Sequence, residues 1–538
     1  MRFSPTLLSA ALACAFGLAL PARAQQVGLP DIGSSAGELL TPQQEQEYGA
    51  YTLYQLRRYG YVLEDPLLDS WLSGMGHRLA ASSDRPEQPF TFFMMRDRQI
   101  NAFATLGGYV AVNAGTVLAA RNEDEIAGVL AHEISHVTQR HVLRAVERAK
   151  KDQLPIMLAT LGVIIAAQES GGQNKSGYGD SRGDAIQAAV IGGQALAAQR
   201  QLDYTRTSEA EADRVGIQTL FRSGYNADGM ADFFERMERL TRADSGDEVP
   251  SYLSTHPVTT TRLSEARDRA ERLRREKPAM SAPHNPAASN PLLPFALQST
   301  GTVATAPPLR QFDWARERMR VLSALTPDKA VREAKAQVDD AAGKPTDAQR
   351  YGLALAESRN GFPAAADDTL AALAKAHPDN LFVGVALAEN AWTAHNEALS
   401  RQRFEALMSR HPDDRTVIIS YAAMLNAIGG ADAGRRAQAI LRPILPANAD
   451  DPLFQKTFGR ASELAGDDSR AGEAFAEAAY LNGRAEDALN QFNSLLKRND
   501  LSYIQRSRIE ARIAEITPEV LDMQRHNMRP QDQPPDSG

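Results

Sequence analysis

The chain has 538 residues, a formal net charge of −8 at neutral pH and a single cysteine, Cys14. An acidic balance without basic clusters argues against nucleic acid as a partner. The length allows two or three domains with hydrophobic cores, and one cysteine excludes an intramolecular disulfide bond.

The first 24 residues have the pattern of a secretory signal peptide. Arg2 precedes an apolar run at residues 7–20, and Ala22-Arg23-Ala24 has the small-x-small pattern of a cleavage site. The run is too short to span a membrane. Removal of this segment takes away two arginines and Cys14, which changes the net charge from −8 to −10 (−8 − 2). A lipoprotein anchor at Cys14 is the weaker alternative, so we expect export to a bacterial periplasm.

Two short stretches with high β propensity come next, at residues 90–94 and 109–112, and both predict strands. Gly107 and Gly108, just before the second strand, would allow close approach of another backbone. The stretches form either a plain hairpin, with Asn101 in a turn, or a sheet edge that pairs with an extended peptide through main-chain hydrogen bonds.

A well-specified helix is predicted from residue 123 onward. Asn122 is a suitable N-cap, and three acidic residues follow in the first turn, where the helix dipole favours negative charge. Further along, His132-Glu133-Ile134-Ser135-His136 puts two imidazoles on one helical face, where both can reach one zinc ion. Glu133 can then act on a water molecule at the zinc. His141 is expected to point away from this face. The alternative is a surface histidine pair without metal.

A catalytic zinc needs a third protein ligand and an open position for water. Glu209 is the best candidate, because Asp213 lies four residues later on the same face of a second predicted helix. From there Asp213 can accept the other N–H of a ligand histidine and fix its tautomer. Glu211 is expected to be solvated. The alternative is an ordinary acidic helix start capped by Ser208.

Two apolar stretches, at residues 154–167 and 185–198, flank a glycine-rich loop at residues 171–183. Each is short for a membrane span. They predict either a helical hairpin packed over the metal site or a hairpin that dips into a membrane interface, because exposed apolar surface of this size needs a partner.

The rest of the chain is predicted to be a linker, a helical repeat domain and a tail. Residues 277–310 are rich in Pro, Ala, Ser and Asn, which is typical of a linker. Beyond them, His377-Pro378-Asp379 recurs 34 residues later as His411-Pro412-Asp413, and 34 residues is the tetratricopeptide period. The pattern predicts an α-helical solenoid over residues 311–516, with a concave face for peptides or proteins. A non-repetitive helical bundle is the alternative. Residues 517–538 are predicted to be disordered.

The metal motif and its surroundings resemble the gluzincin zinc metallopeptidases related to HtpX. The resemblance covers about residues 40–275 and depends on four separated motifs in the same order. These are Ile100-Asn101-Ala102-Phe103-Ala104 with Gly107-Gly108-Tyr109; His132, Glu133 and His136; Tyr204 and Arg206 before Glu209 and Asp213; and Ser254-Thr255-His256-Pro257 with Arg262.

That resemblance implies a role for each matched residue. His132, His136 and Glu209 are expected to bind one Zn²⁺ per chain, with Glu133 as the general base. Asp213 and Arg206 are expected to support the ligands. A strand edge that holds the substrate is expected at Asn101, Ala102, Phe103, Gly107 and Gly108.

His256 has two possible roles. By the resemblance it lies near the metal, where it would either stabilise the oxyanion of the reaction or fill the open position of the zinc and keep the enzyme latent.

The sequence therefore predicts an α+β zinc metallopeptidase domain at residues 25–276, mostly helical with a small sheet, followed by a tetratricopeptide solenoid. This arrangement resembles periplasmic family members that act in outer-membrane protein quality control. The resemblance implies unfolded or misassembled outer-membrane proteins as clients. It also implies contact between the repeats and the β-barrel assembly machinery, and peripheral contact with the membrane. The alternative function is that of a chaperone or adaptor with a latent metal site.

Overall fold

The computed structural model describes residues 40–148, 205–243, 252, 256–275 and 311–525. Five predicted segments lie outside these residues: the signal peptide at 1–24, the apolar stretches at 154–167 and 185–198, the loop at 171–183 between them, and the linker at 277–310. The motif residues Tyr204, Ser254 and Thr255 lie outside them as well. The described chain is mostly helical with one small sheet, so the expected α+β class and the helical C-terminal region are both confirmed.

A three-stranded sheet forms the centre of the N-terminal region, with strand order β1-β3-β2. The central strand β3 (Tyr109–Asn113) pairs in parallel with β1 (Thr91–Met95) and antiparallel with β2 (Ala102–Ala104). Every residue of β3 is buried, which suits its short β-branched sequence. Both predicted strands are present, and β2 is left at one edge of the sheet.

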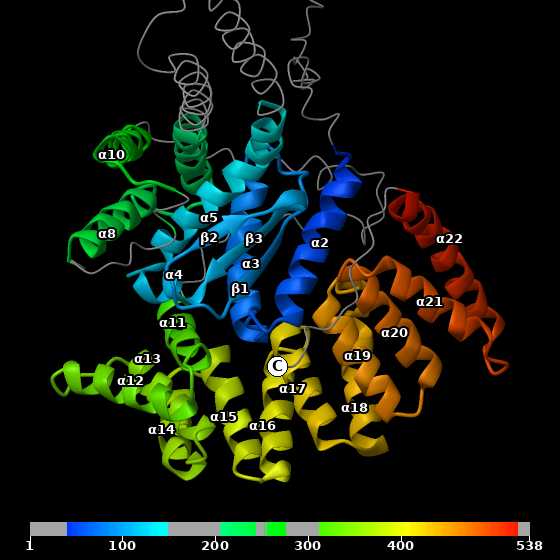
Figure 1. Cartoon of the computed structure of the whole chain (residues 1–538). Coiled ribbons are helices and arrows are strands. Elements are labelled where there is room, and N and C mark those ends of the chain that lie inside the picture. Colours follow the sequence, from blue (N-terminus) through cyan, green and yellow to red (C-terminus); the bar gives the residue numbers. More distant parts are fainter. Residues whose placement is uncertain (1–39, 149–204, 244–251, 253–255, 276–310, 526–538) are drawn as a thin grey trace, which may run out of the picture.

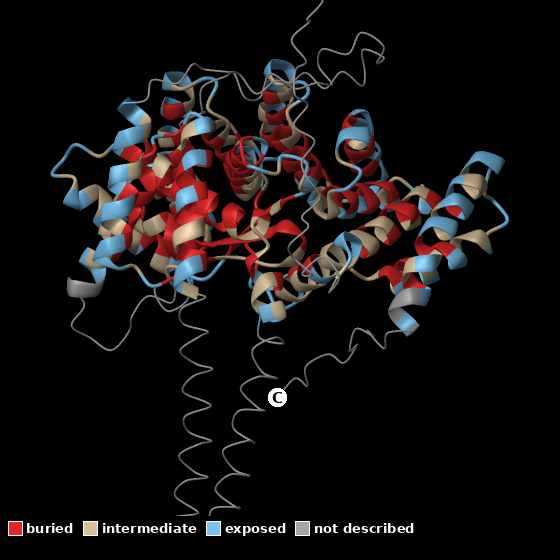
Figure 2. Ribbon diagram, turned by 90° about the horizontal axis from the view of Figure 1, so that it is seen from above, coloured by how far each residue is buried: buried red, intermediate tan, exposed pale blue. Residues whose placement is uncertain are grey.

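Helices cover this sheet and bury its apolar side chains (Figures 1 and 2). The long helix α5 (Glu123–Thr138) packs against β2, β3, α3 (Pro66–Ala81) and α8 (Gly229–Ala243). The remaining elements of this region are α2 (Pro42–Arg58), η2 (Leu106–Gly108), α4 (Ala114–Ala119), α10 (Thr260–Arg275) and helical segments at 141–148 and 205–222.

The second part of the molecule is a curved array of helices, which we call the helical array (Figure 1). It consists of α11 (Phe312–Leu322), α12 (Pro327–Asp340), α13 (Asp347–Arg359), α14 (Pro363–Ala376), α15 (Leu381–Thr393), α16 (Glu397–Arg410), α17 (Arg415–Ile428), α18 (Gly430–Leu441), η4 (Arg442–Ala447), α19 (Pro452–Leu464), α20 (Asp468–Leu481), α21 (Ala485–Leu496) and α22 (Tyr503–Arg525). Each helix packs against the next, and α13, α15, α17 and α19 also pack against one another in turn.

The array has a regular period. Helices α13, α15 and α17 begin at Asp347, Leu381 and Arg415, so successive starts are 34 residues apart (381 − 347 and 415 − 381). The repeated His-Pro-Asp motif lies at the turns, where the side chains of Asn380 and Asp414 cap α15 and α17. Small polar caps at a fixed interval therefore set where each helix pair begins.

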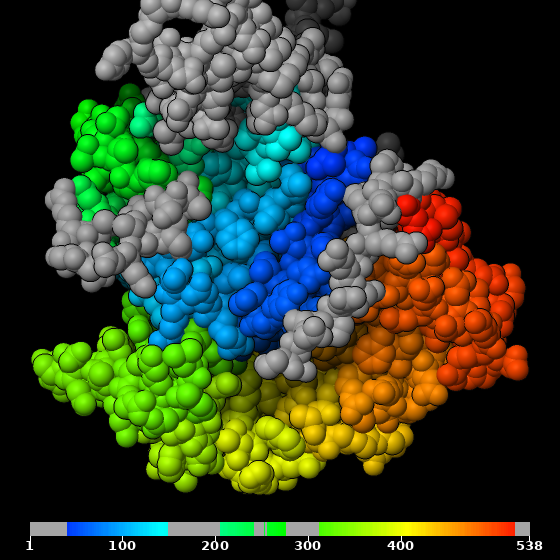
Figure 3. Space-filling view, in the orientation of Figure 1, coloured from blue at the N-terminus to red at the C-terminus, as the bar shows by residue number. Residues whose placement is uncertain are grey.

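The helical array curves around the N-terminal region (Figure 3). The contacts between them include an ion pair of Arg98 with Glu333 of α12 at 2.8 Å and two further polar contacts, with α3 and with α2. At the first, the buried guanidinium of Arg318 pairs with Asp65, the N-cap of α3, at 2.7 Å. At the second, Arg57 of α2 donates to Oδ1 of Asn482 at 2.7 Å, and Arg484 lies over the ring of Tyr54. These polar anchors fix the array against α2 and α3.

The end of the array differs from the prediction. Helix α22 continues to Arg525, whereas the sequence predicted a disordered tail from residue 517. The helix continues because Ile516 and Val520 are buried together with Phe492, and Tyr480 hydrogen-bonds Glu519 at 2.9 Å. Among the described helices, none combines the length and apolar character that crossing a membrane requires.

Candidate metal centre

Helix α5 presents the two histidines of the metal motif from inside the core. The side chain of Asn122 accepts the N–H of Glu125 at 3.0 Å and so fixes where the helix begins. Ile126, Leu130 and Ile134 are fully buried and hold the helix against the sheet. His132 is fully buried as well, and the helical period of 3.6 residues directs its ring and that of His136 to one side.

The helical segment at 205–222 brings Glu209 to these rings. A Cβ atom on Gly216 would lie 2.8 Å from Cε of Met230 and 3.1 Å from the backbone of Ala131, so glycine permits the close approach to α5. Oε2 of Glu209 lies 3.3 Å from Nε2 of His132, and its Oε1 lies 3.3 Å from Nε2 of His136.

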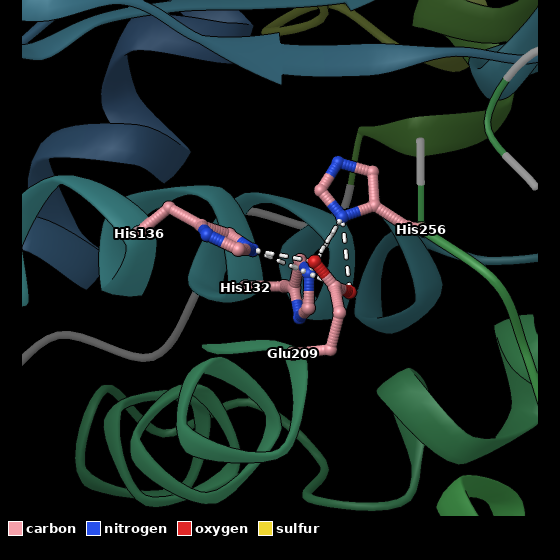
Figure 4. A group of neighbouring side chains, drawn as sticks. All are labelled: His132, His136, Glu209 and His256. Atoms are coloured by element: carbon pink, nitrogen blue, oxygen red, sulfur yellow. Dashed lines mark hydrogen bonds and ion pairs between the residues drawn. The ribbon is translucent and has the colours of Figure 1, made fainter. Parts of the chain in front are cut away.

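His256 is the fourth member of the cluster and lies on the side opposite His136 (Figure 4). Its Nδ1 lies 2.9 Å from Oε1 of Glu209 and 3.3 Å from Nε2 of His132. The backbone N–H of His256 donates to the carbonyl of Tyr252 at 2.7 Å, which anchors the segment that carries the ring. The ligand-type atoms of His132, His136, Glu209 and His256 all lie within 4.8 Å of one another.

The spacing of these atoms fits a tetrahedral zinc ion. With bonds of about 2.0–2.1 Å, neighbouring ligand atoms around zinc lie about 3.3 Å apart. The two Nε2 atoms of His132 and His136 are 3.0 Å apart, and each lies 3.3 Å from an oxygen of Glu209. Two imidazoles and one carboxylate are also a donor set that catalytic zinc uses.

On the side away from the cluster, the ring of His132 contacts the buried ion pair of Asp213 and Arg262. Its Nδ1 lies 3.0 Å from Oδ1 of Asp213, and Arg262 donates to both oxygens of Asp213, at 2.7 and 2.8 Å. Nη1 of Arg262 also lies 3.0 Å from Oε2 of Glu209. Arg206, which was expected to support the ligands, has an exposed side chain. The guanidinium of Arg262, on α10, contacts both Asp213 and Glu209.

Electrostatics divide the ligands into charged and neutral groups. Burial opposes a charge on His132, but hydrogen bonds with Asp213 and Glu209 outweigh it and raise its pKa to about 10. Burial lowers the pKa of His136 to about 3, so that ring is neutral. Burial would raise the pKa of Glu209, yet hydrogen bonds with the histidines lower it well below its ordinary value. Without metal, His132 therefore carries an extra proton near neutral pH.

Glu133 is a buried carboxyl beside the cluster. Burial raises its pKa above the ordinary value, while the nearby His256 opposes the shift. Its Oε1 is buried, receives no hydrogen bond from the described protein atoms, and lies 3.6 Å from Nε2 of His256. The backbone of Ala104 hydrogen-bonds the carboxylate. A carboxyl with a raised pKa and an unpaired oxygen is suited to proton transfer.

The edge strand β2 runs past this carboxyl. Asn101 and Thr105 pair with β3 through backbone hydrogen bonds, so the intervening Ala102 and Ala104 point their peptide groups to the open edge. The side chain of Asn101 accepts the N–H of Ala102 at 3.0 Å. Among the described strands, β2 has no neighbour on that side, while the half-buried ring of Phe103 packs edge-on against Phe93.

Gly107 and Gly108 do not belong to this edge, contrary to the expectation. Both are buried, with φ of 72° and 80°, a region that favours glycine. A Cβ on Gly107 would lie 2.6 Å from the carbonyl of Glu45, and one on Gly108 would lie 2.1 Å from that of Pro89. Among the described residues, the backbone that approaches these glycines is therefore the chain's own.

Two residues that the sequence placed outside the site contact it. His141 lies with its Nδ1 2.8 Å from Nδ1 of His136, and its Nε2 lies 3.1 Å from Oε2 of Glu211. Glu211 is not simply solvated, because Arg144 also donates to Oε2 at 3.1 Å. The expectation that His141 points away assumed an unbroken helix. Helix α5 instead ends at Thr138.

Comparison with known proteins agrees with this geometry. A sequence model of peptidase family M48 matches residues 66–270, which include all the residues of the cluster. The beta-barrel assembly-enhancing protease of Escherichia coli is 30% identical over 495 residues, which are 91% of each chain. The protein of the same name from Yersinia pestis is 28% identical over 495 residues, again 91% of each chain.

A relative from Vibrio cholerae, given the same name provisionally, is 42% identical over 289 residues, which are 53% of this chain and 55% of that one. The chain thus spans about half the length of that relative, but nearly the whole of the Escherichia coli protein. The match at 30% identity over 91% of the Escherichia coli chain shows that the protein is a metalloendopeptidase and belongs to peptidase family M48.

Proposed function

We propose that this chain is a periplasmic zinc endopeptidase that hydrolyses misfolded or stalled outer-membrane proteins. The observation that carries the proposal is the cluster of two imidazoles and a carboxylate at zinc-ligand spacing, with a buried glutamate beside it. The names of the relatives, which refer to β-barrel assembly and to proteolysis, support the client class. Export depends on the predicted signal peptide at residues 1–24.

In this proposal, Nε2 of His132, Nε2 of His136 and the carboxylate of Glu209 hold one zinc ion. When bound, zinc in such a site lowers the pKa of a coordinated water molecule and polarises the scissile carbonyl. Glu133 accepts the proton of the attacking water at Oε1 and delivers it to the leaving amine. Its raised pKa makes the carboxylate a stronger proton acceptor than an ordinary glutamate. Asp213 keeps the proton of His132 on Nδ1, so that Nε2 faces the centre.

The substrate is proposed to extend along β2. The carbonyl groups of Ala102 and Ala104 face the open edge and can accept N–H groups of an extended peptide. Pairing of this kind uses main-chain groups and selects side chains weakly. Weak selection suits a protease whose clients share a misfolded state and no common sequence.

We propose that His256 keeps the resting enzyme latent. Its Nδ1 lies close to Glu209 and His132, where a fourth ligand would stand, and so competes with water for that position. His256→Ala should then raise the rate of casein cleavage. A lower rate would favour the alternative role in oxyanion stabilisation, and an unchanged rate would contradict both roles.

The helical array is proposed to be a tetratricopeptide domain that binds the β-barrel assembly machinery. Support comes from the 34-residue interval between the starts of α13, α15 and α17 and from the capped turns between them. We assign residues 25–276 to the peptidase domain, residues 277–310 to the linker and residues 311–525 to the array. Peripheral contact with the outer membrane, through the apolar stretches at 154–198, belongs to the same proposal.

A chaperone or adaptor with a latent metal site is the second candidate. The observation in its favour is that His256 supplies a fourth donor and thereby fills the position that hydrolysis needs. The two candidates differ in what Glu133→Gln does in cells. If that variant still maintains outer-membrane integrity, the chaperone role gains support.

Hydrolysis is tested with purified protein, casein and a misassembled porin, with and without a chelator. Glu133→Gln should keep the zinc content and lower turnover by about 10²–10⁴-fold, because it removes the proton acceptor. Glu235→Gln is the matched control, since Glu235 of α8 makes partly exposed ion pairs with Arg239 and with Arg267 of α10. Chelator-insensitive cleavage, or wild-type protein without stoichiometric zinc, would contradict the proposal.

A further inference from the structure

The two histidines of the metal motif are supported in different ways. Each ring turns Nε2 toward the cluster and Nδ1 away from it. Behind His132, Nδ1 meets the carboxylate of Asp213, which is a common outer partner of a metal-binding histidine. Behind His136, Nδ1 meets another imidazole, that of His141, at 2.8 Å. A hydrogen bond between two imidazoles requires one specific tautomer on each ring.

The tautomers can be assigned from the outside inward. The side chain of Arg144 has only hydrogen-bond donors. Both Arg144 and Nε2 of His141 contact Oε2 of Glu211. Nε2 of His141 therefore carries the proton and donates it to the carboxylate. In a neutral ring, Nδ1 of His141 is then an acceptor. When a metal ion occupies the centre, Nδ1 of His136 would supply the proton of that hydrogen bond, which leaves the lone pair of its Nε2 to bind the ion.

The local backbone explains how His141 reaches this position. In an unbroken helix, a residue five positions after His136 would lie well away from its face. Helix α5 ends at Thr138, and Arg140 adopts a φ of 54°, which reverses the chain. The side chain of Arg140 pairs with Glu45 at 2.5 Å and anchors this turn. The turn brings the His141 ring back against His136, where its side chain is only 5% exposed.

We propose that His141 and Glu211 are positioning residues that fix the tautomer and orientation of the His136 ring and so slow the loss of the metal ion. The inference depends on the zinc site of the proposed function, but it concerns metal retention and leaves the chemical step to Glu133. Neither residue reaches the reacting atoms, since His136 stands between them and the cluster.

The test measures zinc affinity and release by competition with a chromogenic chelator, on the full chain. His141→Ala should weaken zinc binding by about 10–100-fold and speed release, as loss of such a partner typically does. His141→Gln should restore part of the affinity, because its amide oxygen can accept from Nδ1 of His136. Glu211→Ala should have a smaller effect, since it acts through His141. His77→Ala is the matched control, because His77 is an exposed residue of α3 whose ring donates one hydrogen bond to the carbonyl of Ser73 and packs edge-on against Phe92.

Zinc affinity and turnover together separate positioning from catalysis. Glu133→Gln should bind zinc as tightly as wild type and lose turnover, whereas His141→Ala should bind zinc more weakly. Unfolding of the chelated proteins shows whether a variant has folded, and His141→Gln replaces His141→Ala if the latter has not. An affinity within twofold of wild type for both His141 variants overturns the inference. Wild-type protein that binds no stoichiometric zinc overturns the proposed function instead, so the two failures are distinct.

Discussion

The metal centre and the helical array are built on opposite plans. At the centre, charged and polar side chains from four separate segments converge in the core, among them the buried Glu209, Asp213 and Arg262. In the array, neighbouring helices bury mainly apolar side chains, with a few buried polar groups such as Arg318 and Glu473, and the side chains of Asn380 and Asp414 act as caps at a regular interval. A centre of the first kind depends on each member, because removal of one leaves another charge buried and unpaired. An array of the second kind spreads its stability over neighbouring units.

The largest effect is expected from Arg262→Ala at the centre. The change removes one of the two cations that contact the buried carboxylates of Asp213 and Glu209 and leaves only the charged His132, so the chelated protein should lose about 3–5 kcal/mol of unfolding free energy. Urea denaturation in the presence of chelator measures this loss. The matched control is Arg222→Ala, which removes an exposed ion pair with Asp84 and should cost less than about 1 kcal/mol. Equal losses in the two variants would show that burial does not set the cost.

The array should respond locally to a core deletion. Leu370 of α14 is fully buried, and truncation to Ala should cost about 2–5 kcal/mol. Because α14 packs against α13 and α15, faster hydrogen exchange should be confined to those helices. Zinc content should not change. If Leu370→Ala also released zinc, the array and the centre would be one cooperative unit and the comparison would fail.

In both regions, the sequence predicts the features that recur at a regular spacing. The four-residue spacing of His132 and His136 and the 34-residue interval of the repeat each correspond to a regular helical geometry. It does not predict parts that depend on a break in regularity. His141 reaches His136 only because Arg140 reverses the chain, and no residue pattern indicates that turn.

Other differences from the sequence-based expectations have the same origin. Gly107 and Gly108 matched a family motif, but the pattern could not show which backbone approaches them. Arg262 was visible as part of a motif, and its partners became evident only when α10 was placed against Asp213. Long-range packing decides these cases, and a single sequence carries little information about it.

Proton release on zinc binding is the next effect in size. Because the pKa of His132 in the metal-free protein is about 10 while that of His136 is about 3, zinc must displace one proton at pH 7. Zinc affinity should therefore rise about tenfold per pH unit between pH 7 and 9, or about 1.4 kcal/mol per unit. Calorimetry in buffers of different ionisation enthalpy counts the proton.

The stability of the metal-free protein depends on pH in the opposite direction to zinc affinity. A raised pKa of His132 stabilises the fold below its unfolded-state pKa of about 6.5, and this contribution is lost as the pH rises toward 10. The increase in Tm caused by zinc should therefore grow with pH. A zinc-induced shift that is the same at pH 6 and pH 9 would contradict the charged His132.

The smallest effect is expected from a single cap in the array. Asp414→Ala removes the side chain that accepts from the N–H groups of Thr416 and Val417, and should cost about 1 kcal/mol. The matched control is Asp413→Ala, because Asp413 is an exposed neighbour that belongs to the repeated His-Pro-Asp motif and does not cap α17. Urea denaturation should separate the two variants. A loss for Asp414→Ala as large as that for Arg262→Ala would mean that the capped turns are as indispensable as the buried charges, and the contrast between the two plans would not hold.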